Sequence, residues 1–296
     1  MRIKIVIALI LVSFSSCVKD VDYKLDFEGS KLVVIANGQA NNNLTAFVTQ
    51  TFKPLTQIDN PDSLLINDAF IEIFENSILV DTMVLVENGK YKSNMTLKEN
   101  HEYQIRVKSD GLGKVVSQSD TVSLPAKLIN ASIINIYPEK DTTLSYKIYL
   151  DIDLVIKKST LFPYNNLTIN YFFNGITQED YLFLSSKSDF IECDNCFNLL
   201  DNPCTINKGN GLYEIKTQII LYRPDFVLDE LDSVQFVLET YSSLAEKLCQ
   251  AGIDLEEYYN NPLPFSSNPP ADFSNIEGGY GLFLLNSVDS ATVKLK

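Results

Sequence analysis

Four cysteines in the second half of the chain are the residues best suited to crosslinking or metal binding. They are Cys193, Cys196, Cys204 and Cys249. An even number of cysteines in an exported protein favours disulfides, and four allow three pairings among which the spacing does not choose. The alternative is zinc, because two residues separate Cys193 from Cys196 and Cys204 follows nearby. We expect structural disulfides, since the one histidine, His101, lies far away in sequence.

Catalytic patterns are the second place to look for chemistry. The sequence contains no HExxH, GxSxG, P-loop or GxGxxG motif. His101 precedes a predicted strand, a position typical of a turn residue. Asp151 and Asp153 alternate on one face of another strand, where they could hold calcium or act as acid and base. A solvated strand face explains that pair more simply, so we expect no catalytic residue, no metal and no cofactor.

The first half of the chain, which contains His101, is predicted to consist of short β-strands. Runs rich in Val, Ile, Leu, Tyr and Phe alternate with turn residues, as in strands of a sheet with one buried face. The predicted strands are 31–36, 44–52, 69–75, 78–86, 91–97, 103–108 and 114–123. Seven short strands without a convincing helix predict an immunoglobulin-like or transthyretin-like sandwich over residues 31–125.

The second half, residues 126–296, predicts another antiparallel β domain with one short helix. The predicted strands are 127–137, 145–157, 167–173, 181–185, 213–222, 233–240 and 291–295. Residues 186–212 form a long loop that carries three of the cysteines. Ser243-Leu244-Ala245-Glu246 matches a capping box that starts the helix, and Gly252 ends it. The glycines between residues 278 and 281 are expected to allow a bulge or a close backbone approach.

The N-terminus predicts export and lipidation. Arg2 and Lys4 precede an apolar run that is too short to span a bilayer but has the length of a signal-peptide core. Ser15 and Ser16 then lead to Cys17, an order that resembles a bacterial lipobox, although Phe14 stands where leucine is usual. We therefore expect a signal peptide over residues 1–16, lipid on Cys17 as the membrane anchor, and a tether over residues 17–30.

Charge limits the classes of partner. Cleavage before Cys17 removes two basic residues, Arg2 and Lys4, and no acidic residue, so the net charge of −14 becomes −16. A strongly acidic chain repels nucleic acid, and no basic run suggests otherwise. The hydrophobic content of 45% is sufficient for packed cores, which excludes a disordered chain.

Several segments in order along the chain resemble one family of Bacteroidota outer-membrane lipoproteins with a domain of unknown function. The matching segments are the signal with Cys17, Leu32–Gly38, Ile66–Ile73, Asn88–Tyr91, His101–Val107 and Ser274–Phe283. Members of this family are usually encoded beside TonB-dependent transporters. The resemblance implies an accessory role near such a barrel and brings no established chemistry. Residues 18–22 also resemble a signal for export to the outer surface, with a periplasm-facing anchor as the alternative.

Six Asp-Ser or Asp-Thr pairs are similar to the O-glycosylation motif of Bacteroidota envelope proteins. The hydroxyl residues are Ser63, Thr82, Thr121, Thr142, Ser233 and Ser290. Such pairs also begin turns and strands, which is the structural explanation. We hypothesise that some are glycosylated, and an intact mass equal to that of polypeptide plus lipid would exclude it.

These observations favour a non-enzymatic lipoprotein that is an accessory or substrate-capture subunit of a TonB-dependent transporter or another outer-membrane barrel. The alternative is a surface hydrolase or a calcium-dependent glycan-binding protein that uses loop carboxylates. A structural envelope protein without a ligand is a third possibility.

Overall fold

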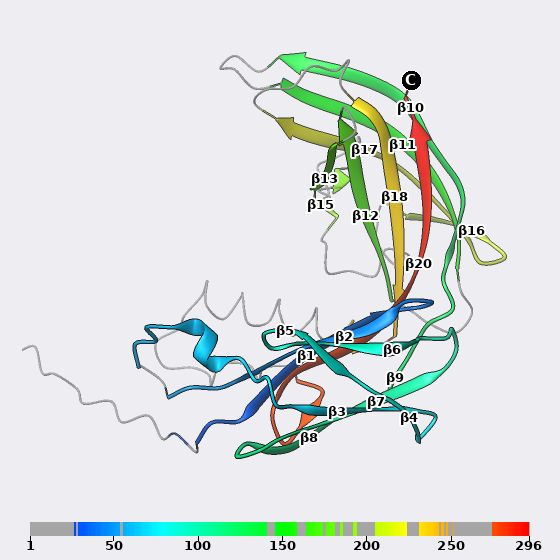
Figure 1. Ribbon diagram of the computed structural model, residues 1–296. Helices are drawn as coiled ribbons and strands as arrows, with labels where there is room; N and C mark the ends of the chain where they lie inside the picture. The colour runs from blue at the N-terminus through cyan, green and yellow to red at the C-terminus, as the bar shows by residue number, and fades with distance from the viewer. Residues whose placement is uncertain are drawn as a thin grey trace, which may run out of the picture.

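The computed structural model has two lobes joined by long strands (Figure 1). It describes residues 27, 29–53, 56–140, 146–158, 164–173, 176–180, 184–185, 192–193, 205–223, 231–242, 244–245, 247, 251 and 274–295. The fold is mostly β, as the sequence predicts. A 3-10 helix, η1 (Pro61–Leu64), is also present. Of the predicted helix, Leu244, Ala245, Lys247 and Ala251 are helical, and its other residues lie outside the described part.

The largest sheet, called the long sheet, has eight strands and runs through both lobes (Figure 1). In spatial order these are β13 (Ile176–Asp180), β12 (Tyr164–Phe173), β18 (Leu231–Tyr241), β20 (Tyr280–Lys294), β1 (Leu32–Gln39), β2 (Asn43–Gln50), β6 (Lys90–Thr96) and β5 (Val84–Glu87). Neighbouring strands are antiparallel except β1 and β20, which are parallel. The last strand therefore joins the first near the centre of the sheet.

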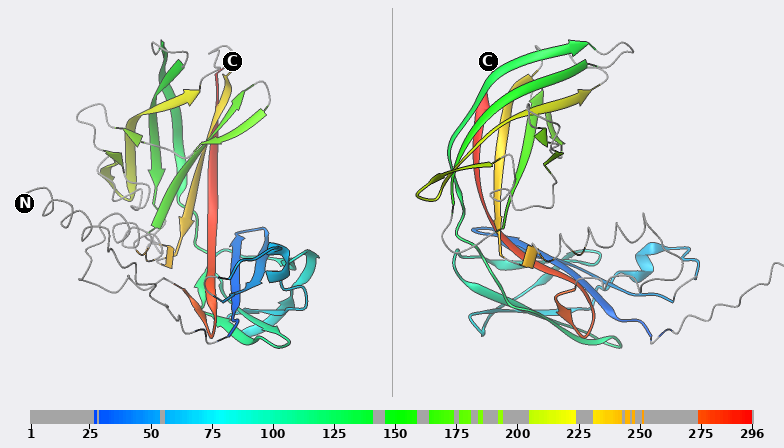
Figure 2. Two further views of the ribbon diagram at one scale, coloured as in Figure 1. Left: turned by 90° about the vertical axis from the view of Figure 1, so that its left-hand side faces the viewer. Right: turned by 180° about the vertical axis from the view of Figure 1, so that it is seen from behind.

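Each half of the long sheet is covered by a smaller sheet. The first covering sheet contains β19 (Ile276–Glu277), β8 (Gly113–Ser117), β7 (Glu102–Ser109), β3 (Phe70–Glu75) and β4 (Ile78–Thr82), with β9 (Asp120–Thr121) on β7. The second contains β10 (Lys127–Lys140), β11 (Tyr146–Lys157), β17 (Leu212–Arg223), β14 (Leu184–Ser185) and β15 (Glu192–Cys193), with β16 (Thr205–Gly209) on β17. The lobes are two sandwiches that share one continuous sheet (Figure 2).

Two hydrophobic cores lie on the same face of the long sheet. In β20, Phe283 and Leu285 belong to the first core, and Val293 packs against the second. These positions differ by even numbers of residues, so their side chains point to one face of the strand. The other face of β20 carries Leu284 and Asn286, which are partly exposed.

The end of the chain does not follow the predicted division at residue 125. The sequence placed residues 276–285 in the second unit, but Ile276, Phe283 and Leu285 are buried in the first core. Hydrogen bonding explains the difference, because the parallel pairing of β20 with β1 brings residues 280–286 against the first strand. The division of the rest of the chain into two domains stays a prediction.

Asn275 and Ser274 fasten β20 in this position. The Asn275 side chain is 1% exposed, accepts the Phe283 backbone N–H at 2.8 Å and donates to the Phe283 carbonyl at 2.7 Å. The Ser274 hydroxyl donates to the Gly281 carbonyl at 3.0 Å. The segment Ser274–Phe283 is therefore a structural clasp, because its first residues bond to β20 while Ile276 and Glu277 pair with β8 of the first covering sheet.

Asp120 makes a second tie between β9 and β20. Its carboxylate accepts the backbone N–H groups of Leu285 at 2.8 Å and Thr121 at 2.9 Å, and it is 3% exposed. Burial raises the pKa of Asp120 to about 6, against the hydrogen bonds from Ser242, Leu285 and Thr121, which lower it. The folded protein therefore holds this proton more tightly than the unfolded chain does.

The pKa of Asp120 predicts a measurable loss of stability as the pH rises. Because the folded pKa lies above the unfolded value of 3.8, the contribution of this group falls between about pH 4 and 6. In Asp120→Asn this group cannot ionise. Between pH 4 and 7.5 the free energy of unfolding should therefore fall by about 2 kcal/mol more in the wild type than in the variant. Urea unfolding of both proteins at the two pH values measures this difference. An identical pH dependence in both proteins would contradict the assignment.

Candidate functional site

A polar cavity of about 430 Å³ lies where the two lobes meet. Its lining comes from β1, β2 and the turn between them, from the end of β18, and from β20. The lining residues are Asn37, Gly38, Gln39, Asn42, Asn43, Thr45, Glu239, Tyr241, Leu284 and Asn286. In Figure 1 the ends of β1 and β2 meet the lower end of β18 beside β20. The site therefore depends on the pairing of the first strand with the last.

Alternation along the strands explains why polar side chains gather here. In β1, Ala36 is buried in the first core, while the neighbouring Asn37 is exposed on the other face. Gly38 returns to the core side, where a Cβ atom would lie 2.3 Å from the Leu97 Cδ1 atom. The cavity lies on the face of the long sheet opposite to the cores, and side chains supply its polar groups.

Hydrogen bonds hold part of the cavity wall in place. The Glu239 carboxylate accepts the side-chain amides of Asn166 at 3.2 Å and Asn286 at 3.3 Å. Asn43 donates its amide to the backbone carbonyls of Ser93 and Met95 at 3.1 and 3.0 Å, which anchors β2 to β6. Three lining side chains, those of Asn43, Glu239 and Asn286, therefore already form hydrogen bonds within the protein.

Other side-chain amides in the cavity have hydrogen-bonding groups without a partner among the described residues. The Asn37 carbonyl accepts the Thr45 hydroxyl at 2.7 Å, which leaves the Asn37 NH₂ group free of contacts with described residues. Within the described part of the chain, the Gln39 and Asn42 side-chain amides bond to no protein group. Among the described residues of the lining, Glu239 is the only charged one.

A second feature, the apolar edge, lies on β4 and β5. Six exposed aliphatic side chains occur within nine residues: Ile78, Leu79, Val80, Val84, Leu85 and Val86. β4 ends the first covering sheet and β5 ends the long sheet. Exposed apolar side chains favour contact with another protein. Edge strands add to this, because the outer N–H and C=O groups of their backbone can pair with another chain.

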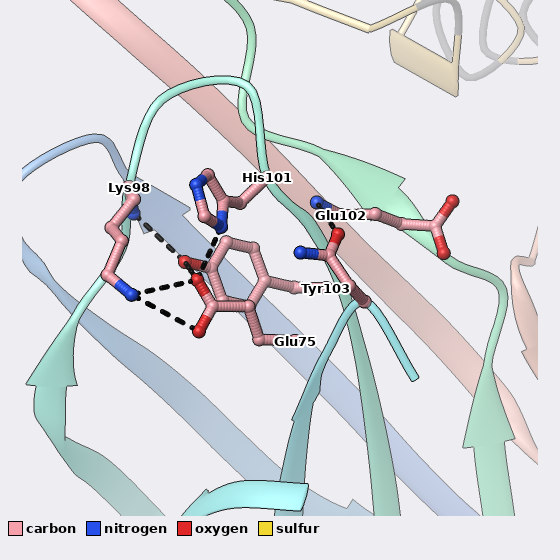
Figure 3. Close-up of polar contacts among 6 residues, drawn as sticks. Glu75, Lys98, His101, Glu102 and Tyr103 are labelled. Carbon is pink, nitrogen blue, oxygen red and sulfur yellow. Dashed lines mark hydrogen bonds and ion pairs between the residues drawn. The ribbon is translucent and has the colours of Figure 1, made fainter. Parts of the chain in front are cut away.

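The single histidine belongs to a cluster at the end of β3 (Figure 3). The Tyr103 hydroxyl donates to the Glu75 carboxylate at 3.1 Å and accepts the Lys98 backbone N–H at 3.0 Å. The Lys98 ammonium donates to both carboxylate oxygens at 3.1 and 3.3 Å. The His101 Nδ1 atom lies 2.6 Å from the same carboxylate, at ion-pair distance but without hydrogen-bond geometry.

The contacts within this cluster hold the turn before β7 in place. Burial opposes ionisation of Glu75, but the hydrogen bonds from Lys98 and Tyr103 and the charges of Lys98 and His101 outweigh it, so the pKa of Glu75 is lowered. Burial, with the Glu75 charge, raises the pKa of Tyr103 to about 12. His101 directly follows the turn at Glu99 and Asn100 and precedes β7, and the sequence did not identify Glu75 as its partner.

The carboxylate pair on β11 differs from the expected solvated face. Asp151 is 8% exposed, and its carboxylate accepts the Asn135 amide at 3.1 Å. Asp153 is partly exposed, 3.7 Å from the Lys216 ammonium. The expectation is wrong for Asp151 because β10 lies beside it and supplies Asn135. Among the described residues, no group of three or more His, Cys, Asp or Glu could hold a metal ion.

Several predicted site residues lie outside the described part. These are Cys17, Cys196, Cys204, Cys249 and Thr142. Cys193 lies in β15, and its side chain is not described. Disulfide pairing and lipidation therefore stay predictions. Among the helices that the structure describes, none has the length and apolar character needed to cross a membrane.

The remaining glycosylation candidates differ in exposure. Ser63 and Ser290 are exposed, and Thr82, Thr121 and Ser233 are partly buried. The aspartates of three pairs bond to backbone: Asp81 to Thr82, Asn94 and Met95, Asp120 to Thr121 and Leu285, and Asp289 to Leu128. These contacts give such pairs a structural role, and their glycosylation stays a prediction.

The fold, with its cavity at the junction, defines a protein of two β-sandwich lobes that share one sheet. The chain matches the family described as Domain of unknown function (DUF4249) over residues 18–292, and it belongs to this family. No curated protein matches. Among solved structures, a marsupial T cell receptor chain is 9% identical, with 88% of this chain and 73% of that chain covered and a TM-score of 0.23.

Proposed function

We propose that the protein is a non-enzymatic, lipid-anchored subunit of an outer-membrane complex, docked through the apolar edge onto a β-barrel, most simply a TonB-dependent transporter. The observation that carries this proposal is the apolar edge, where six aliphatic side chains are exposed on two edge strands. Such a surface is typical of an interface with another protein. The cavity at the junction supplies the place for a ligand.

The resemblance of the N-terminus to a lipobox, and of residues 18–22 to a surface-export signal, supports an anchor at Cys17 on the outer membrane, facing outward. Membership of the DUF4249 family fits the same proposal, because the family resemblance implies a neighbouring barrel. The lipid holds the protein in the membrane plane, so an apolar edge meets its partner at high effective concentration. No nucleic acid is expected as a partner, because the chain is strongly acidic.

Capture from the native outer membrane tests the proposal. The protein, extracted in mild detergent and affinity-purified, should bring one barrel protein with it in near-equal amount by mass spectrometry. Ile78→Lys/Val84→Lys places two charges on the apolar edge and should lower recovery of the barrel at least tenfold. Both side chains are exposed, at 68% and 47%, so the fold should tolerate the change.

Two control variants separate docking from anchoring. Thr292→Lys adds charge at an exposed position of β20 and should leave recovery unchanged. Cys17→Ala should release the protein from the membrane and abolish recovery. Recovery of the wild-type lipoprotein alone, or equal recovery with the doubly substituted edge, would refute the proposal.

A further inference from the structure

The cavity at the junction has a lining that selects its ligand by charge. No Lys, Arg or His is among the lining residues that the structure describes, so an anionic ligand would find no counter-charge from them. The one carboxylate, Glu239, already accepts two amide N–H groups, from Asn166 and Asn286. A cation would compete with these bonds for a single carboxylate. The lining therefore favours an uncharged ligand.

The hydrogen-bonding groups of the lining indicate which class of uncharged ligand fits the cavity. A side-chain amide both donates and accepts, and so does each hydroxyl of a sugar. Gln39 and Asn42 have amides that bond to no other described residue, and Asn37 has a free NH₂ group. These groups come from β1 and the following turn, so they line one side of the cavity. Their spacing along one wall suits a ligand with several neighbouring hydroxyls.

A peptide strand fits this place less well. At the cavity, β1 is paired on both sides, with β2 and β20, and β18 is paired with β12 and β20. The strand backbones therefore have no free edge to which an extended peptide could add. Only side chains are available, together with the apolar surfaces of Leu284 and the Tyr241 ring.

Apolar side chains lie next to the cavity on the same strands, outside its lining. Ile35 pairs with Phe47 on β2 and Leu282 on β20, forming an apolar row one step along β1 from Asn37. Ile35 is 51% exposed and Phe47 40%. Pyranose rings present C–H faces that pack on apolar and aromatic side chains. A volume of about 430 Å³ is within the range of small-ligand pockets.

We infer that the cavity formed by β1, β2, β18 and β20 binds a neutral carbohydrate, held by the Asn37, Gln39 and Asn42 amides without a metal ion. This inference deepens the proposed binding function. The amides select for hydroxyl groups, and the lack of basic side chains in the described part of the lining selects against sialylated or sulfated sugars. The Glu239 carboxylate orients the wall through Asn286.

Binding to a glycan array tests the inference. The mature lipoprotein in detergent micelles, with EDTA present, is applied to an array of neutral, sialylated and sulfated glycans. We expect retention of neutral members. Gln39→Ala/Asn42→Ala removes the two uncommitted amides and should weaken binding at least tenfold. Asn41→Gly is the matched control, because Asn41 lies in the same turn at φ 64° but does not line the cavity, so its binding should equal wild type.

The outcomes are separable from those of the barrel capture. Retention of no neutral glycan, retention of anionic glycans only, dependence on calcium, or equal binding by the Gln39→Ala/Asn42→Ala variant would each overturn the inference. Circular dichroism melting confirms that the variants are folded. If the barrel is captured but no glycan binds, only the ligand class is wrong. If neutral glycans bind but no barrel is recovered, the docking proposal is wrong.

Discussion

Replacing Gly281 with alanine is expected to lower the free energy of unfolding by at least about 3 kcal/mol. Gly281 lies opposite Val34 in the parallel pair of β20 and β1. A Cβ atom at residue 281 would lie 1.9 Å from the Val34 carbonyl oxygen and 2.7 Å from its carbonyl carbon. Backbone atoms of a central strand cannot move aside without breaking the pairing. The φ angle of 121° adds strain for any residue with a side chain.

A matched glycine separates the contact from the backbone angle. Gly111 also has a positive φ, of 87°, but a Cβ atom there would meet nothing within 4 Å. Gly111→Ala should therefore cost only about 1 kcal/mol, from backbone strain. Guanidinium unfolding followed by tyrosine fluorescence measures both variants, since the chain has 15 tyrosines and no tryptophan. Equal losses in the two variants would show that the Val34 contact is unimportant.

Strand positions were predictable because alternation is a local signal. In β3, Ile71 and Ile73 are buried while the neighbouring Phe70 and Glu72 are not, which is the pattern that the sequence displays. β11 was predicted in the same way, because apolar and polar residues alternate from Tyr146 to Leu154. Such a pattern identifies a strand and its buried face but not the partner strand.

Pairing between distant strands was not predictable. β1 and β20 are separated by more than two hundred residues, and the alternation within each strand does not identify the other as its partner. The expectation of a close backbone approach at residues 278–281 is confirmed, because a Cβ atom at Gly279 or Gly281 would clash with backbone oxygens of β1. The sequence did not indicate which strand approaches.

The cavity was missed for the same reason. Its first wall was visible as an amide-rich run, residues 37–43, that the strand pattern left unexplained. Glu239, Tyr241 and Asn286 come from strands far along the chain and reach the cavity only through the pairing of β1, β20 and β18. The cluster of Glu75 and His101 is likewise a contact between the end of β3 and the residue before β7, and their proximity depends on the pairing of these two strands.

Replacing Asn275 with alanine should be almost as damaging as the change at Gly281. The Asn275 amide is the side-chain partner of both the N–H and the carbonyl of Phe283, at 2.8 and 2.7 Å. Its removal leaves two buried backbone groups without this partner, at about 1–3 kcal/mol each. We therefore expect the free energy of unfolding to fall by about 2–5 kcal/mol. The same denaturation experiment measures this loss.

Two further variants distinguish the clasp from a general loss of packing. Asn275→Asp keeps the acceptor for the Phe283 N–H but loses the donor to its carbonyl and buries a carboxylate, so it should not restore stability. Asn94→Ala changes an exposed asparagine of β6 and should alter stability by less than about 0.5 kcal/mol. Because β20 also carries Leu284 and Asn286 into the cavity, the Asn275→Ala protein should bind neutral glycans more weakly even where it remains folded. Wild-type stability in Asn275→Ala would mean that the hydrogen bonds from Asn275 to Phe283 do not contribute to stability.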